Sequence, residues 1–205
     1  MSVDINTHNR RRQIILLSGL YLLAVALGVG SALLWLTKVG VSGERVGTWR
    51  VNLLAGSRDA DVYTRARIAL GAVLALNRSE TLYYTTDHDD NGVTLRAECH
   101  YRVEGLPPPA RWWSLTAYDA DHFLFPNDLK RYSVSSETVR LDNEGRFSAT
   151  IGAPTNSSQS DASWIPTSRS GVIHLTLRLY SASEAVQHAP GLLATPSIRR
   201  VGACQ

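Results

Sequence analysis

The residue pattern best suited to binding an ion is a short acidic loop, DHDDNG at residues 87–92, followed by Glu98. Its spacing matches a calcium loop, in which carboxylate and amide oxygens surround a hard cation. The residues after the loop alternate as a strand does, which would carry Glu98 roughly 20 Å away at ~3.3 Å per residue. We therefore predict a polar hairpin loop rather than a metal site, with Asp87, Asp89 and Asn91 as a partial calcium site in the alternative.

Residue patterns with a known catalytic mechanism are not found in the sequence. It holds neither the G-x-S-x-G elbow of a serine nucleophile nor a glycine-rich phosphate loop, and its histidines lack the paired spacing of a helical metal motif. We interpret His100, His122, His174 and His188 as surface or core residues. No cofactor is expected.

Tryptophan and arginine side chains form the best candidate for a binding surface. Neighbouring residues of a strand point to opposite faces, so one of Trp112 and Trp113 lies in the core and the other faces solvent, a ligand or a partner. An outward tryptophan beside an arginine suits stacking on a sugar or anchoring a protein interface. The candidate surface comprises Trp112, Trp113, Tyr118, His122, Trp164 and Arg178.

Short segments with the alternation of β-strands position these residues. They are 80–86, 94–103, 112–118, 131–134, 139–141, 146–151 and 172–180, with a hairpin turn at 142–145. One face of 112–118 carries Trp112, Ser114, Thr116 and Tyr118, and the polar face of 172–180 carries His174, Thr176, Arg178 and Tyr180. A helical pattern covers 61–76. We predict a mainly β fold, an antiparallel β-sandwich of jelly-roll type with one N-terminal helix, preceded by a transmembrane helix.

The N-terminal region has the composition of a membrane anchor. Residues 14–36 are 23 consecutive uncharged positions, which make a helix of roughly 35 Å and span a bilayer. Arginines at 10–12 precede them, so the positive-inside rule keeps the N-terminus in the cytoplasm and exports the body. A signal peptide has a shorter apolar region of about 7–15 residues, so we expect an uncleaved signal anchor, with cleavage as the alternative.

The N-terminal region and the rest of the chain differ in net charge. The net charge of +3 lies in residues 1–40, and the remaining chain has equal numbers of acidic and basic side chains. A neutral body gains no counterion release from a phosphate backbone, so we expect no nucleic-acid partner. The predicted organisation is a cytoplasmic N-terminus at 1–13, a transmembrane signal anchor at 14–37, a connector or edge segment at 38–60, and an exported domain at 61–205.

The sequence has two cysteines, Cys99 and Cys204. Exported domains fold in an oxidising compartment, where an even number of widely separated cysteines favours a disulfide. We predict a bond between them, with two buried free thiols as the alternative.

Six motifs follow one another along about residues 48–200: DVYTRARIALGAVLALN, DDNGVTLRAECHYRVEG, PPPARWWSLTAYDADHFL, the pattern RYS at 131–133, SWIP at 163–166, and LTLRLYSA. Their order and spacing resemble the bacterial domain-of-unknown-function family 1214. The resemblance implies a β-sandwich domain fused to, or encoded beside, a companion domain of family 1254, and it implies no catalytic residue. The chain is similar to the short, membrane-anchored form, which implies a single-pass protein of the bacterial inner membrane with its β domain in the periplasm.

These observations together predict an interaction module rather than an enzyme. We expect a membrane-anchored, envelope-facing domain that pairs with a separately encoded companion of family 1254. The alternative is a hydrolase or carbohydrate-active enzyme with its site near the Trp, Arg and His cluster. A deep pocket with converging His, Asp and Arg groups would favour the enzyme, and a flat apolar patch would favour the partner.

Overall fold

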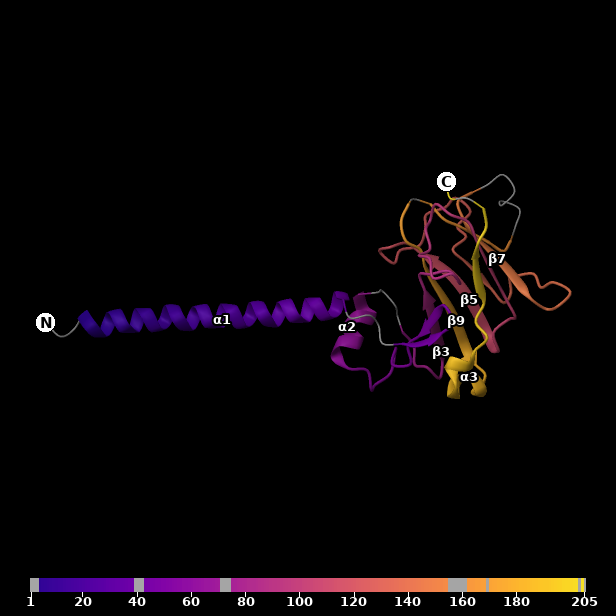
Figure 1. Cartoon of the computed structure of the whole chain (residues 1–205). Helices are drawn as coiled ribbons and strands as arrows, with labels where there is room; N and C mark the ends of the chain where they lie inside the picture. The colour runs from indigo at the N-terminus through magenta and orange to yellow at the C-terminus, as the bar shows by residue number, and fades with distance from the viewer. Residues whose placement is uncertain are drawn as a thin grey trace. The chain divides into compact units, whose positions relative to one another are not determined.

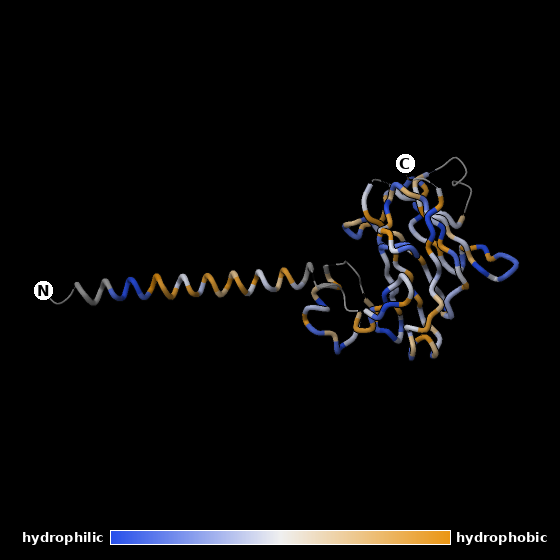
Figure 2. The backbone as a smooth tube through the Cα atoms, viewed as in Figure 1, coloured by the Kyte–Doolittle hydropathy of each residue, from blue (hydrophilic) through white to orange (hydrophobic). Residues whose placement is uncertain are grey.

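The computed structural model describes residues 4–38, 43–70, 75–154, 162–168, 170–202 and 204 (Figure 1). The chain divides into two units, Met1–Val41 and Ser42–Gln205. The first unit contains one helix, α1 (Asp4–Lys38). Within it, Asn9–Trp35 is long and apolar enough to cross a membrane, and Figure 2 shows this hydrophobic stretch following a hydrophilic start. The predicted candidate for a membrane span is therefore present as a continuous helix.

The second unit is mainly β and contains two sheets. In spatial order, the six-stranded sheet comprises β1 (Glu44–Val46), β2 (Trp49–Val51), β3 (Thr81–Thr86), β9 (His174–Ala182), β5 (Ala110–Tyr118) and β6 (Ser133–Ser135). The four-stranded sheet comprises β10 (Ser197–Arg200), β4 (Tyr101–Gly105), β7 (Phe147–Gly152) and β8 (Trp164–Pro166). Short helices are α2 (Val62–Leu70), α3 (Glu184–His188) and η1 (Pro190–Leu192).

The two sheets share one hydrophobic core. Strands β3, β5 and β9 contribute alternate residues to it, and so do β4 and β7 of the other sheet. The ring of Trp113 on β5 lies 4.7 Å from that of Phe147 on β7, measured between centroids. The alternation in the sequence therefore sorts these strands into a buried face and an opposite face, as a two-residue period requires.

One strand pair differs from the antiparallel arrangement predicted for the whole domain. Strands β7 and β8 run parallel, with Thr150 opposite Trp164 and Ile151 opposite Ile165. A parallel pair needs a connection long enough to carry the chain back to the starting end of the strand. Residues 153–163 connect the two strands, and 155–161 of them lie outside the described part of the chain.

The predicted strand 94–103 is regular only from Tyr101 onward. Its alternation still sets burial, because Leu95, Ala97 and Cys99 are all buried. The backbone nevertheless turns, since the N–H of Cys99 donates to the carbonyl of Arg96 (3.1 Å). The N–H groups of Leu95 and Ala97 donate to two different segments, at Asp87 and Gly171. Periodicity thus predicted which side chains are buried, but not the hydrogen-bonding pattern of the backbone.

Other predicted elements also differ in extent. Residues 139–141 form no strand, and only an isolated bridge joins Leu141 to Phe147. The turn between them is present: Gly145 has a φ of 74°, and its N–H donates to the carbonyl of Asp142. The helix predicted over 61–76 is described as α2 only to Leu70, and residues 71–74 lie outside the described part. Residues 44–51 form β1 and β2, which pair onto β3 at one edge of the sheet.

Candidate functional site

The polar faces predicted for two separate strands come together on one side of the six-stranded sheet. Strands β5 and β9 are antiparallel neighbours, and their register sets Trp112 opposite Tyr180, Ser114 opposite Arg178, Thr116 opposite Thr176, and Tyr118 opposite His174. On β3, Tyr83 lies opposite Arg178. We call these nine residues the outer face. It is the side of the sheet opposite the shared core.

Arg178 lies at the centre of the outer face. It is half-buried, and its two terminal nitrogens donate to the hydroxyls of Thr116 (3.2 Å) and Tyr118 (2.6 Å). Its guanidinium carbon lies 5.5 Å from the ring centroid of Tyr118 and 6.0 Å from that of Tyr83. Both rings thus offer a cation–π contact. The three ion pairs between described residues all lie elsewhere, so the charge of Arg178 faces hydroxyls and aromatic rings rather than a carboxylate.

Trp112 and Trp113 lie on opposite sides of the sheet, as the sequence predicts for neighbours on a strand. Trp113 is 2% exposed and belongs to the core. Trp112 is half-buried and packs edge-on against Tyr180, with ring centroids 5.1 Å apart. Trp164, predicted as part of the same surface, is 1% exposed, and its indole N–H donates to the carbonyl of Gly152. Its strand pairs with β7 and lies in the other sheet, so Trp164 does not join the outer face.

His122 and His174 form a pair at one end of the outer face. Their ring centroids lie 4.8 Å apart. His174 is half-buried, and burial together with the neighbouring His122 lowers its pKa below the ordinary value. His122 occupies an exposed loop with a φ of 64°, in the left-handed region that favours glycine. The loop therefore holds a histidine where a glycine would meet less strain.

The acidic loop at residues 87–92 uses its carboxylates within the chain. Asp87 pairs with His88 (2.7 Å), and one oxygen of Asp89 accepts from the backbone N–H groups of Asn91 and Val93. Glu98 accepts from Arg96 and from the N–H of Gly171. Among the described residues, no group of three or more His, Cys, Asp or Glu side chains could hold a metal ion. The loop has the hydrogen bonds of an Asx turn.

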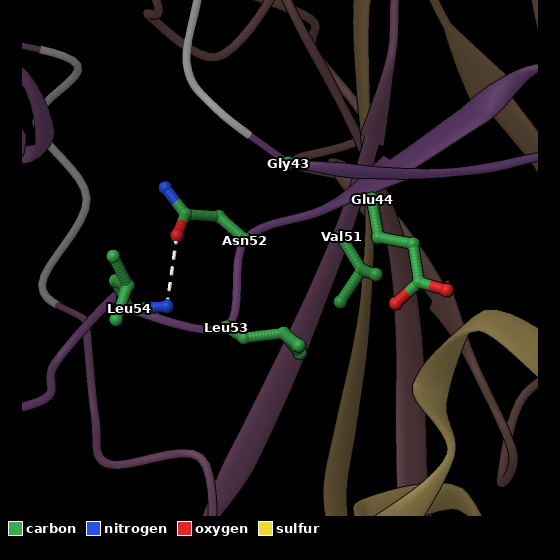
Figure 3. Close-up of a pocket in the computed structure, with 6 residues that line it drawn as sticks. All are labelled: Gly43, Glu44, Val51, Asn52, Leu53 and Leu54. Carbon is green, nitrogen blue, oxygen red and sulfur yellow. Dashed lines mark hydrogen bonds between the residues drawn. The ribbon is translucent and has the colours of Figure 1, made fainter.

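Among the hollows on the described part of the second unit are two that differ in size and lining. One of about 360 Å³ is lined by Gly43, Glu44, Val51, Asn52, Leu53 and Leu54. In Figure 3 the carboxylate of Glu44 points away from Asn52, whose side chain accepts from the N–H of Leu54. The other, of about 880 Å³, includes Trp164, Glu98 and Lys130 in its lining. The described lining of neither hollow includes a histidine or an arginine, and the titratable side chains of the larger one are Glu98, Asp128, Lys130 and Tyr132.

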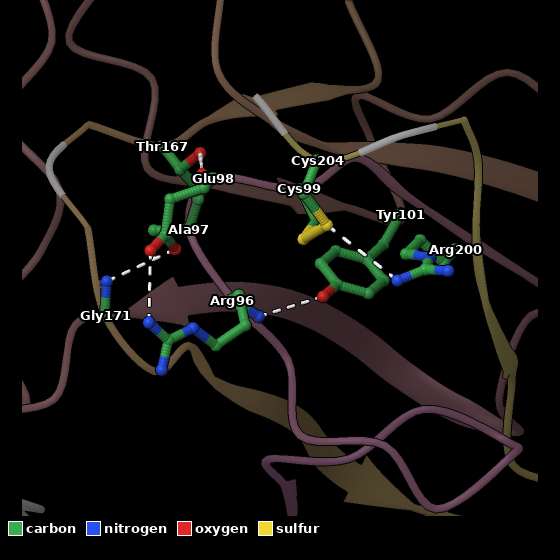
Figure 4. The surroundings of a disulfide bond; sticks show 9 residues. All are labelled: Arg96, Ala97, Glu98, Cys99, Tyr101, Thr167, Gly171, Arg200 and Cys204. Carbon is green, nitrogen blue, oxygen red and sulfur yellow. Dashed lines mark hydrogen bonds and ion pairs between the residues drawn. A yellow bond between two sulfur atoms is a disulfide. The ribbon is translucent and has the colours of Figure 1, made fainter.

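The two cysteines form a disulfide, as predicted. Cys99 and Cys204 have Cα atoms 4.1 Å apart, and Figure 4 shows the bond beside Tyr101 and Arg200. A guanidinium nitrogen of Arg200 lies 3.9 Å from the sulfur of Cys204. The bond joins the end of the chain beyond β10 to the segment before β4, and these two strands already pair. The bond therefore links two segments that are neighbours in space but 105 residues apart in the sequence.

Comparison with known proteins assigns the β domain to a family. A family model described as "Protein of unknown function (DUF1214)" matches residues 80–184. The chain belongs to the DUF1214 family. The match begins at β3 and ends beyond β9, so it includes every residue of the outer face.

Solved structures of other proteins match parts of this DUF1214 chain. The VPA0106 protein from Vibrio parahaemolyticus is 26% identical with a TM-score of 0.58, and the match covers 70% of this chain and 36% of that one. A putative uncharacterized protein from Burkholderia cenocepacia is 12% identical with a TM-score of 0.44, over 83% of this chain and 40% of that one. This chain thus spans little more than a third of the Vibrio protein. A search of curated proteins finds no match.

The structure brings together four of the six residues predicted for a binding surface. Trp112, Tyr118 and Arg178 lie on the outer face of the DUF1214 domain, and His122 lies beside it against His174. Sequence reasoning did not include Tyr83. The alternation of Thr81, Tyr83 and Thr85 with Leu82 and Tyr84 was the signal that could have placed it there. What the sequence lacked was the pairing of β3 with β9.

Proposed function

We propose that this DUF1214 protein is a single-pass, membrane-anchored binding module whose β domain is exported into the periplasm and pairs with a separately encoded companion domain. The outer face of the six-stranded sheet is the proposed contact surface. The two sheets with their shared core are proposed to form a β-sandwich of jelly-roll type. The observation that carries the proposal is the gathering of half-buried Trp112, Tyr118 and Arg178 on one side of the sheet, away from the core.

The anchor and its direction are supported by α1 and by the cysteines. The candidate span covers Asn9–Trp35, and the arginines at 10–12 lie at its beginning. A positive flank stays in the cytoplasm, so the chain after the span is exported. A disulfide between Cys99 and Cys204 is consistent with an oxidising compartment.

A protein partner is supported by the residue types of the outer face. Tryptophan, tyrosine and arginine are the residues most enriched among those that dominate binding energy at interfaces. The outer-face residues Trp112, Tyr118 and Arg178 line neither of the hollows described above, so a partner surface suits them better than a substrate pocket. In the Vibrio protein the larger part of the chain lies outside the shared region, which supports a further domain as the partner.

Reporter fusions test the topology. Alkaline phosphatase placed after Gln205 is active only in the periplasm, and green fluorescent protein placed there fluoresces only in the cytoplasm. We expect phosphatase activity without fluorescence. Fluorescence without phosphatase activity would contradict an exported domain, and a mature chain that begins after Leu36 would contradict the uncleaved anchor.

Co-purification tests the contact surface. The full chain, carrying Trp112→Ala, is captured together with a companion protein of family 1254, and binding is compared with the unmodified chain. We expect a loss of about 2 kcal/mol or more of binding free energy, as for a residue at the centre of an interface. The matched control is Leu192→Ala, which removes an apolar side chain that is 86% exposed on η1. Equal binding by both variants would contradict the proposal.

A further inference from the structure

We infer that Arg178 anchors a carboxylate-binding site on the outer face, and that the carboxylate is an aspartate or glutamate side chain of the partner protein. The inference rests on the proposed function, because it names the chemistry by which the partner is held. It goes beyond that function by assigning one residue and one ligand group.

The unused donors of Arg178 are the first observation. A guanidinium has five N–H groups, and here two of them donate, to Thr116 and Tyr118. The other three have no hydrogen-bond partner among the described residues. A half-buried cation that has lost part of its water gains most from an opposite charge. The outer face thus holds a cation whose strongest possible partner is not supplied by the described part of the chain.

The position of the guanidinium is fixed before any ligand arrives. The hydroxyl of Tyr118 accepts at 2.6 Å and that of Thr116 at 3.2 Å, while the rings of Tyr118 and Tyr83 lie within 6.0 Å of the guanidinium carbon. A held arginine loses less side-chain entropy when it binds. Its planar fork matches the two oxygens of a carboxylate, which a lysine could not do in the same way.

The neighbours of Arg178 favour a singly charged ligand. Ser114 and Tyr83, directly opposite on the two adjacent strands, are neutral, and so is Thr116. Another arginine of this side, Arg50, lies opposite Thr85 on β2, beyond β3. A doubly charged phosphate would find one cation here, whereas a carboxylate needs only one. Trp112 and Tyr180 extend the surface with aromatic area that suits a protein rather than a free ion.

The test uses the full chain in lipid nanodiscs and a small probe that carries the proposed group. The probe is N-acetylglutamate α-amide, whose only charge is its side-chain carboxylate, and the matched neutral probe is N-acetylglutamine α-amide. Binding is followed by NMR at the indole N–H of Trp112, assigned with Trp112→Phe, and at the Nε–H of Arg178. We expect a saturable shift at both signals with the glutamate probe. The glutamine probe should bind at least about tenfold more weakly.

Variants separate the site from general effects of charge. Arg178→Gln should weaken the glutamate probe by about tenfold or more at the Trp112 signal, and Arg140→Gln, an exposed arginine outside the outer face, should leave it unchanged. Tyr118→Phe removes one hydroxyl that holds the guanidinium and should weaken binding several-fold. It also serves as a second variant if thermal melting shows that Arg178→Gln disturbs the fold.

Three results would overturn the inference: no saturable shift up to the solubility limit of the probe, equal binding of the two probes, or equal loss in Arg178→Gln and Arg140→Gln. Stronger binding of methyl phosphate than of the glutamate probe would also contradict a carboxylate site. If the probe fails but Trp112→Ala still abolishes companion binding, the proposed function stands without this site. If the probe binds while Trp112→Ala leaves companion binding unchanged, Arg178 still binds a carboxylate, but the proposed contact surface and the partner protein as the source of that carboxylate are both contradicted.

Discussion

The two faces of strand β5 differ in how far their side chains are exposed to solvent. On the inner side, Trp113 and Leu115 are closed into the core shared with the other sheet. On the outer side, Trp112 and Tyr118 are half-buried and surround Arg178, a cation without a carboxylate partner among the described residues. The inner face accounts for the fold by burial of apolar area. Tyr83, Ser114, Thr116 and Thr176 of the outer face are buried as well, whereas Trp112, Tyr118 and Arg178 keep part of their surface exposed. This partial exposure makes these three side chains the candidates for function.

The largest effect expected from this comparison is on stability. Trp113→Ala removes a fully packed indole from the core and should lower the free energy of unfolding by about 3–5 kcal/mol. Trp112→Ala removes a half-buried ring and should cost about 1 kcal/mol. Denaturant unfolding of the full chain measures both. Equal losses would show that the outer tryptophan has a structural role like that of the inner one.

The disulfide contributes to the fold, as the inner face of β5 does, because Cys99 is buried in the same core. Replacing Cys99 and Cys204 together by serine should lower the free energy of unfolding by about 2–4 kcal/mol, since a long loop is no longer closed in the unfolded chain. Unfolding of the oxidised wild type and of the double variant gives the difference. Thiol labelling of both cysteines in the native, non-reduced protein would contradict the bond.

Acidification should lower the stability of the folded chain through His174, which lies against His122 at one end of the outer face. Burial, and then His122, lower the pKa of His174 from its ordinary value of 6.5, while Asp87 and Asp119 act in the opposite direction. The unfolded chain therefore binds this proton more readily, so stability falls as the pH drops from about 6.5 toward the folded-state pKa. We expect a smaller fall in His174→Phe when unfolding is measured between about pH 7.5 and pH 5. A parallel fall in both proteins would assign the effect to other groups.

The smallest effect concerns the loop that holds His122. Three loops share one geometry, with an aspartate oxygen accepting two backbone N–H groups: those that begin at Asp89, Asp119 and Asp142. Two of them place glycine at the left-handed position, and the third places His122 there. His122→Gly should change the free energy of unfolding by less than about 1 kcal/mol and raise the pKa of His174, because the neighbouring imidazole is lost. An NMR titration of His174 that shows no rise would contradict their coupling.

Strand faces could be predicted from the sequence where a two-residue period is combined with regular pairing. Residues 112–118 and 172–180 have this character, and their polar faces meet as direct cross-strand partners. The same period over 94–100 predicted burial correctly but not the turn at Arg96, because backbone groups there bind two other segments. Periodicity reports the environment of side chains and not the partners of the backbone.

The candidate site was only partly predictable because it depends on contacts between distant strands. Arg178 and Tyr118 are 60 residues apart, and Tyr83 joins them from a third strand. Local pattern gave no reason to exclude Trp164, since nothing near it in the sequence announces that β8 pairs in parallel with β7. The family resemblance agreed with the fold class already predicted from strand alternation and added no site residue, so the assembly of the outer face is seen only in the structure.

Radical footprinting with and without a companion protein tests the central claim most directly. Hydroxyl radicals oxidise tryptophan and tyrosine side chains that solvent reaches, and mass spectrometry reads Trp112, Trp113 and Tyr118 separately. We predict oxidation of Trp112 and Tyr118 in the free full chain and their protection when the companion of family 1254 is bound, with Trp113 unreactive in both states. Unchanged oxidation of Trp112 and Tyr118 in a complex shown to have formed would contradict the outer face as the contact surface.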